Sequence, residues 1–176
     1  MRKTAQTHIP ARDAIELLTQ DHERVKDLFY KFEHAQSDNV RKQTCTEICQ
    51  ELDIHTAIEE EIFYPQVREA IDDDDLMDEA EEEHAVAKQI VQDLQGMEPD
   101  DERYAAKVTV LAENVKHHIK EEESQMFPKV KKTDLDLAEL GSSMMQRKRQ
   151  LQEISGLSGE GRPRGSGHKR NNIGAR

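Results

Sequence analysis

Six residues with metal-ligating side chains interrupt four apolar stripes of this sequence. In each stripe, residues recur at steps of three and four, which is the spacing of one helix face. Every stripe holds one histidine, and two also hold a glutamate one turn later. The six are His22, His55, Glu59, His84, His118 and Glu122. Burying an imidazole or a carboxylate without a partner is costly, so six of them in helix seams need a compensating interaction.

The six residues fall into two copies of one pattern. His22 precedes His55 by 33 positions, and His84 precedes His118 by 34. The second histidine of each copy is followed by glutamate four positions later and by proline ten positions later, in the blocks HTAIEEEIFYP and HIKEEESQMFP. The repeat and the apolar stripe both select His118 over the adjacent His117.

The His-x-x-x-Glu spacing places both side chains on one helix face, about 6 Å apart at their Cβ atoms. Four imidazoles and two carboxylates suit a pair of transition-metal ions. If each ion takes two histidines and one oxygen from each of two bridging carboxylates, a shared oxo or hydroxo group brings it to about five ligands. One position then stays open for a diatomic molecule or peroxide. The alternative is a metal-free helical interaction module with structural histidines.

The apolar periodicity predicts helices over about residues 13–35, 39–69, 74–95 and 100–131. Short connections make successive helices antiparallel neighbours, so the expected fold is an all-α, up-down-up-down four-helix bundle. A weaker amphipathic segment over residues 134–154 predicts a short fifth helix that packs on the bundle or forms a subunit contact. Residues 155–176 are basic and glycine-rich with little to bury, which is typical of a disordered tail.

Composition excludes several classes of protein. Of 176 residues, 35% are charged and only 4% are aromatic, and eight glycines and five prolines are few for a sandwich or barrel. The net charge of -12 opposes nucleic-acid and anionic-membrane partners. No apolar run is long enough to span a membrane, and the first residues lack a signal region. With only Cys45 and Cys49, we expect a reduced, cytoplasmic protein. Its oligomeric state is left open between monomer and weak dimer.

The six-residue constellation resembles the hemerythrin-like (HHE cation-binding) domain family, and the FYP at 63–65 and MFP at 126–128 add to the match. The resemblance covers residues 12–132, leaving an accessory helix at 133–154 and the tail at 155–176. It implies a non-haem di-iron centre with oxo or hydroxo and carboxylate bridges, for which manganese or zinc are alternatives. It also implies that His22 and His55 bind one iron, that His84 and His118 bind the other, and that Glu59 and Glu122 bridge.

Two departures from the oxygen-carrying members shape the predicted function. Lys88 stands where those proteins have a fifth histidine, and the chain has H-x-x-x-E where they end in H-x-x-x-x-D. The set is more similar to bacterial relatives that handle nitric oxide or peroxide or repair iron–sulfur clusters. We therefore expect a stress-related di-iron protein that binds or reacts with O2, NO or peroxide. The alternatives are an iron donor for cluster repair and a small peroxidase-like or catalase-like enzyme.

Acidic residues beside the six fall into two predicted groups. Glu51 and Glu83 match places where the cluster-repair relatives carry acids, and the resemblance implies a supporting role or an iron exit path for them. The alternative is that both are plain surface acids. The other acids next to the constellation are predicted to lie on solvated helix faces; they are Glu60, Glu61, Glu81, Glu82, Glu121 and Glu123.

Overall fold

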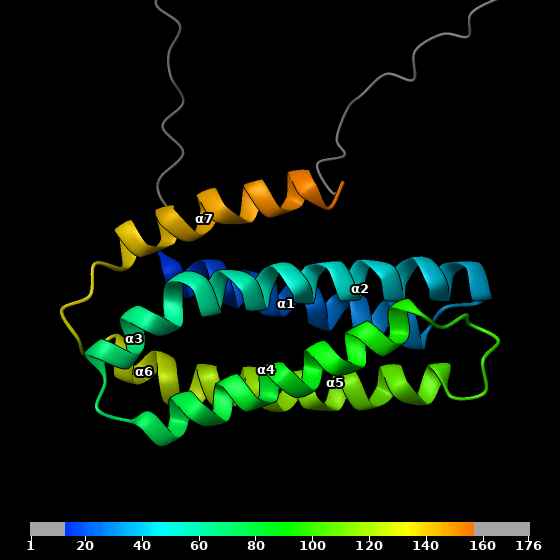
Figure 1. The fold of residues 1–176 in the computed structure, drawn as a ribbon, viewed down its shortest axis with the longest axis horizontal. Helices are drawn as coiled ribbons and strands as arrows, with labels where there is room; N and C mark the ends of the chain where they lie inside the picture. Colours follow the sequence, from blue (N-terminus) through cyan, green and yellow to red (C-terminus); the bar gives the residue numbers. More distant parts are fainter. Residues whose placement is uncertain (1–12, 157–176) are drawn as a thin grey trace, which may run out of the picture.

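Four long helices form the body of the computed structural model, which describes residues 13–156 (Figure 1). They are α1 (Ala14–Glu33), α2 (Asp38–Ile58), α4 (Asp74–Gln95) and α5 (Tyr104–Glu121). Each runs antiparallel to its predecessor, so the predicted up-down-up-down four-helix bundle is confirmed. Side chains cap three of the helix starts: Asp13, Ser37 and Asp73 each accept a hydrogen bond from a backbone N–H of the first turn.

The fourth long helix begins later than predicted. It was expected from about residue 100, but α5 starts at Tyr104. The Asp101 carboxylate accepts the Glu98 N–H at 2.7 Å, and the Asp101 carbonyl accepts the Tyr104 N–H at 3.0 Å. These local bonds hold the chain in turns and delay the helix.

Both glutamate-bearing helices pass through a π-helical turn into a short final helix. The segments are η1 (Glu59–Phe63) with α3 (Tyr64–Ala70), and η2 (Glu122–Met126) with α6 (Phe127–Val130). In each turn, the N–H just before the proline bonds to the carbonyl five residues back, that of Glu59 or of Glu122. Proline lacks an N–H and collides with the carbonyl four residues back in an α-helix, so the wider turn accommodates it.

The π turn also shifts which residue faces the core. Steps of three and four along the second predicted helix, 39–69, lead from His55 to Glu59 and then to Ile62, which is therefore expected to face the core. In the structure Ile62 is only half-buried, and Phe63 is fully buried instead. Because the turn contains one residue more than an α-helical turn, the inward face moves along the chain by one position.

Apolar side chains form two clusters with a polar layer between them. One cluster contains Val25, Leu52 and Leu111, and the other contains Leu18 and Met77. Along their helices, His22, His55, His84 and Glu122 lie between residues of the two clusters. Glu59 directly follows Ile58 of the second cluster, and His118 directly precedes Ile119 of the first. The polar layer is therefore closed at both ends by packed hydrocarbon, which keeps water out.

A fifth helix, α7 (Leu137–Ile154), lies outside the bundle and packs on α1, α2 and η1 (Figure 1). Asp136 caps its start, and Met144 is fully buried beneath it. The predicted accessory helix is thus confirmed, and it packs on the bundle. The predicted tail lies outside the described residues from position 157 onward.

Of the helices within residues 13–156, none is both long and apolar enough to cross a membrane.

Candidate metal centre

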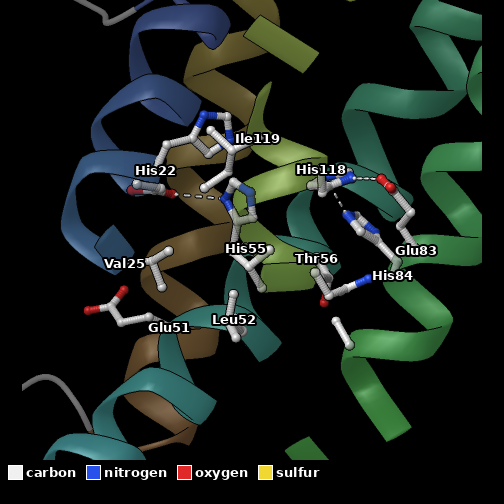
Figure 2. A pocket seen from close by; sticks show the side chains of 14 residues that line it. His22, Val25, Glu51, Leu52, His55, Thr56, Glu83, His84, His118 and Ile119 are labelled. Carbon is white, nitrogen blue, oxygen red and sulfur yellow. Dashed lines mark hydrogen bonds and ion pairs between the residues drawn. The ribbon is translucent and has the colours of Figure 1, made fainter. Parts of the chain in front are cut away.

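All six predicted residues come together in the middle of the bundle. His22 and His84 lie midway along α1 and α4, and His55 and His118 lie in the last turns of α2 and α5. Glu59 and Glu122 are the first residues of the two π turns, and they are 0% and 1% exposed. Figure 2 shows His22 and His55 on one side of a pocket, with His84 and His118 on the other.

Each buried carboxylate lies between two imidazoles, one from each half of the bundle. Glu59 Oε2 is 3.2 Å from His55 Nε2 and 3.3 Å from His84 Nε2. Glu122 Oε2 is 3.1 Å from His22 Nε2 and 3.5 Å from His118 Nε2. The two repeats therefore interlock, because each glutamate contacts a histidine of its own repeat and one of the other repeat.

Several of these inward-facing atoms have no hydrogen-bond partner among the described residues. They are His22 Nε2, both carboxylate oxygens of Glu59, and Glu122 Oε2. The 3.1 Å approach of His22 to Glu122 is thus close but not aligned as a hydrogen bond. Buried polar atoms without partners are rare and destabilising. A bound cation would accept the lone pairs of these converging nitrogen and oxygen atoms and so satisfy them.

The donor atoms form two groups of a size that suits metal coordination. Atoms of His22, His55, Glu59 and Glu122 lie within 4.8 Å of one another, and so do atoms of Glu59, His84 and His118. Imidazole and carboxylate together suit first-row transition metals such as iron, manganese and zinc. The residues present therefore fit a pair of metal ions.

A second layer of carboxylates contacts the outer nitrogens of the histidines. His22 Nδ1 lies 2.9 Å from Glu123, His84 Nδ1 lies 3.0 Å from Glu60, and His118 Nδ1 lies 2.9 Å from Glu83. The fourth contact is longer, at 3.7 Å between His55 Nδ1 and Asp21 Oδ2. Such partners fix the ring orientation and keep Nε2 directed at the centre.

This layer corrects two predictions and refines a third. Glu60 and Glu123 were expected on solvated faces, yet each contacts a buried imidazole and is about one-third exposed. Each directly follows one of the two buried glutamates, Glu59 and Glu122, a repeated position that could have identified them. Glu83 supports His118 as the resemblance implied, whereas Glu51 pairs with Arg24 at 3.4 Å.

Tyr64 is the functional candidate that sequence reasoning missed. Its hydroxyl donates a hydrogen bond of 3.0 Å to Glu122 Oε1 and lies 3.3 Å from His84 Nε2 and 3.4 Å from His118 Nε2. The residue is 2% exposed, and its ring stacks on His84 at 5.3 Å between centroids. Phe127, at the corresponding position of the other repeat, stacks on His22 at 5.9 Å and brings no hydroxyl.

Burial and contacts with neighbouring groups shift the pKa values of Glu59 and Glu122 in opposite directions. Burial raises the pKa of Glu59, and repulsion by Glu122 raises it further. Burial would also raise the pKa of Glu122, but His118 and His22 hold it well below its usual range. The two carboxyls therefore depart from the usual pKa in opposite directions, Glu59 upward and Glu122 downward.

The pKa values of His22, His118 and His55 are also shifted in different directions. Burial alone would lower the pKa of His22 and of His118, but their contacts with Glu122 and with the outer carboxylates raise both above the usual value. His55 lacks such strong partners, and burial lowers its pKa to about 4.

A small cavity adjoins the four histidines (Figure 2). Its volume of about 20 Å³ admits one molecule the size of water. Among the described residues, the amide oxygen of Asn114, which lines this cavity, has no hydrogen-bond partner. The other walls are mostly apolar and include Val25, Leu52, Ala87, Val115 and Ile119. The cavity suits a small ligand and excludes larger substrates.

Comparisons with known proteins agree with this geometry. Residues 13–130 match the sequence profile of the hemerythrin HHE cation-binding domain. A DNA nickase from Nostoc sp. (strain PCC 7120) is 25% identical over 116 residues, which are 66% of this chain and 33% of that protein. The chain thus spans about one third of the length of that curated relative.

A solved structure is also similar to the whole bundle. It is a hemerythrin HHE cation-binding domain-containing protein from Mycobacterium kansasii, 28% identical, with a TM-score of 0.71. The match covers 83% of this chain and 91% of that one. This chain therefore belongs to the hemerythrin HHE cation-binding domain family, and its buried histidine and glutamate groups are able to hold a metal cation.

Proposed function

We propose that the chain is a non-haem di-iron protein that binds or reacts with O2, NO or peroxide. In this proposal His22 and His55 hold one iron, His84 and His118 hold the other, and Glu59 and Glu122 bridge them. The observation that carries it is the convergence of unpartnered, buried nitrogen and oxygen atoms on the middle of the bundle. Bound iron would supply redox chemistry and an open coordination position for a small ligand.

The surrounding residues select and orient that ligand. The apolar walls of the cavity exclude bulk water, and its volume restricts entry to molecules of a few atoms. The Asn114 amide offers a hydrogen bond to a polar ligand, and its i, i+4 spacing places it one turn before His118. The Tyr64 hydroxyl provides a proton beside Glu122.

The decisive experiment is metal content per chain, measured together with the optical spectrum of protein purified in air. Two irons per chain with the near-ultraviolet absorption of an oxidised di-iron centre would support the proposal. A folded protein with no stoichiometric metal, before and after anaerobic loading with ferrous iron, would refute it. His118→Ala should lose iron, and His117→Ala is the matched control because His117 is adjacent and 57% exposed.

Steady-state assays separate binding from catalysis. Continuous turnover of peroxide would identify a peroxidase-like or catalase-like enzyme, and a stoichiometric spectral change without turnover would exclude one. A second candidate function, iron donation, is favoured by a surface group next to the centre. Glu83, His117 and Glu121 bring ligand atoms within 4.8 Å of one another, and Glu83 also contacts His118. Rapid iron transfer to an acceptor would support donation.

We propose no nucleic-acid partner. The similarity to the DNA nickase covers only 33% of that protein, so its activity does not follow for this chain. The net charge of -12 repels a phosphate backbone.

A further inference from the structure

Helix α7 lies beyond residues 13–130, which match the family, yet it reaches the outer layer of the metal centre. Two neighbouring cations on α7 form ion pairs with the bundle. Arg147 donates to both carboxylate oxygens of Glu61, at 2.6 and 2.9 Å. Lys148 donates to Asp21 Oδ1.

The two ion pairs differ in their burial and in whether their carboxylate also contacts one of the six candidate residues. Arg147 and Glu61 are 32% and 46% exposed, and within the described part of the chain Glu61 forms no hydrogen bond or ion pair with any of the six candidate residues. Lys148 and Asp21 are each only 12% exposed. Asp21 directs its second oxygen, Oδ2, at His55 Nδ1, 3.7 Å away.

Asp21 thus stands between a cation and an imidazole, with one oxygen for each. His55 is the only one of the four histidines whose outer nitrogen lacks a hydrogen bond among the described residues. Its orientation therefore depends on where Asp21 is held, and Lys148 is the side chain that holds it. A carboxylate this buried needs a compensating cation, since an unpaired one turns toward water.

We propose that Lys148 is a positioning residue of the metal centre, which holds Asp21 against His55 from a helix outside the family domain. This inference rests on the proposed metal-binding function. It assigns α7 a role beyond covering the bundle. Outer partners of metal-ligating histidines typically change metal affinity by about 10-fold to 100-fold when they are removed.

The test compares Lys148→Met with Arg147→Met. Both variants remove one cation and one ion pair from α7, but only the first disturbs Asp21. Each protein is loaded anaerobically with ferrous iron and then challenged with a ferrous chelator, and iron per chain is followed over time. We expect Lys148→Met to lose one of its two irons about 10-fold to 100-fold more readily than wild type. Arg147→Met should behave as wild type, and Lys148→Arg should restore retention.

The outcomes are distinguishable. If wild type itself fails to bind two irons, the proposed function fails. If wild type binds two and Lys148→Met retains both as Arg147→Met does, the inference about Lys148 is wrong. Circular dichroism of the metal-free variants checks folding. Should Lys148→Met not fold, Asp21→Asn takes its place, with the same selective loss of one iron expected and unchanged retention counting against the inference.

Discussion

Loading the metal-free protein with metal should release at least about two protons for each pair of ions near pH 6. Burial and repulsion by Glu122 raise the pKa of Glu59 well above its usual value, which favours its protonated form. The pKa values of His22 and His118 are raised above 6.5 because their carboxylate contacts outweigh burial, so both are mostly imidazolium. A metal ion binds only the deprotonated form of each group, so these protons must leave.

The magnitude follows from linkage. Each proton released raises the logarithm of the metal affinity by about one per pH unit, so the two imidazolium protons raise the affinity for the pair by up to about 100-fold from pH 6 to pH 7. Zinc is a redox-silent probe for the assay. Titration calorimetry in two buffers with different ionisation enthalpies counts the protons directly.

The control for this measurement is His117→Ala, which should release as many protons as wild type. Release of fewer than about one proton per pair near pH 6, with equal affinity at pH 6 and pH 7, would refute the reasoning. It would mean that the carboxylate and imidazole contacts described above do not hold protons in the metal-free centre.

Three further predictions concern the same residues. The thermal midpoint of the metal-free protein should fall as the pH rises above about 6.5, because His22 and His118 have raised folded-state pKa values and lose their stabilising protons there. A flat profile would contradict this. Glu59→Ala, Glu122→Ala and His118→Ala should each reduce the metal content per chain, whereas His117→Ala should not. Equal metal loss in the His117 and His118 variants would show that the register of the fourth long helix, α5, is wrong. Tyr64→Phe should lower the free energy of unfolding of the metal-free protein by about 1.5–3 kcal/mol, because Glu122 loses a buried hydrogen-bond donor. Urea titrations measure this difference, and an unchanged free energy of unfolding would show that the hydrogen bond contributes nothing to stability.

The bundle and the meeting of its six central residues were predictable because both depend on periodicity. A residue in a heptad stripe faces the core whatever its chemistry, so His22 and Glu122 had to point inward once the helices formed. Two copies of the pattern then placed them at one level. The π turns were not predicted, although Pro65 and Pro128 mark the same position in both copies.

The roles of Glu60, Glu123 and Tyr64 were not predicted, for two different reasons. Glu60 and Glu123 lie in runs of three acids, where composition does not separate a solvated carboxylate from one that supports a histidine. Their contacts also cross between repeats, to His84 and His22, so that only the packed bundle reveals them. Tyr64 escaped notice because the repeat emphasises what its copies share, and Phe127 occupies the equivalent place.

Those differences between the copies bear directly on function. A symmetric frame supplies each proposed metal position with two imidazoles and a share of both carboxylates. Of the four histidines, the Tyr64 hydroxyl adjoins His84 and His118, whereas His22 faces the Phe127 ring. His55 depends on a carboxylate that α7 holds. Because the two positions differ in proton supply and in outer support, two bound irons would be inequivalent. The position near Tyr64 is then the one where a ligand that takes up a proton should react, and the position near His55 is the one that should release its ion first.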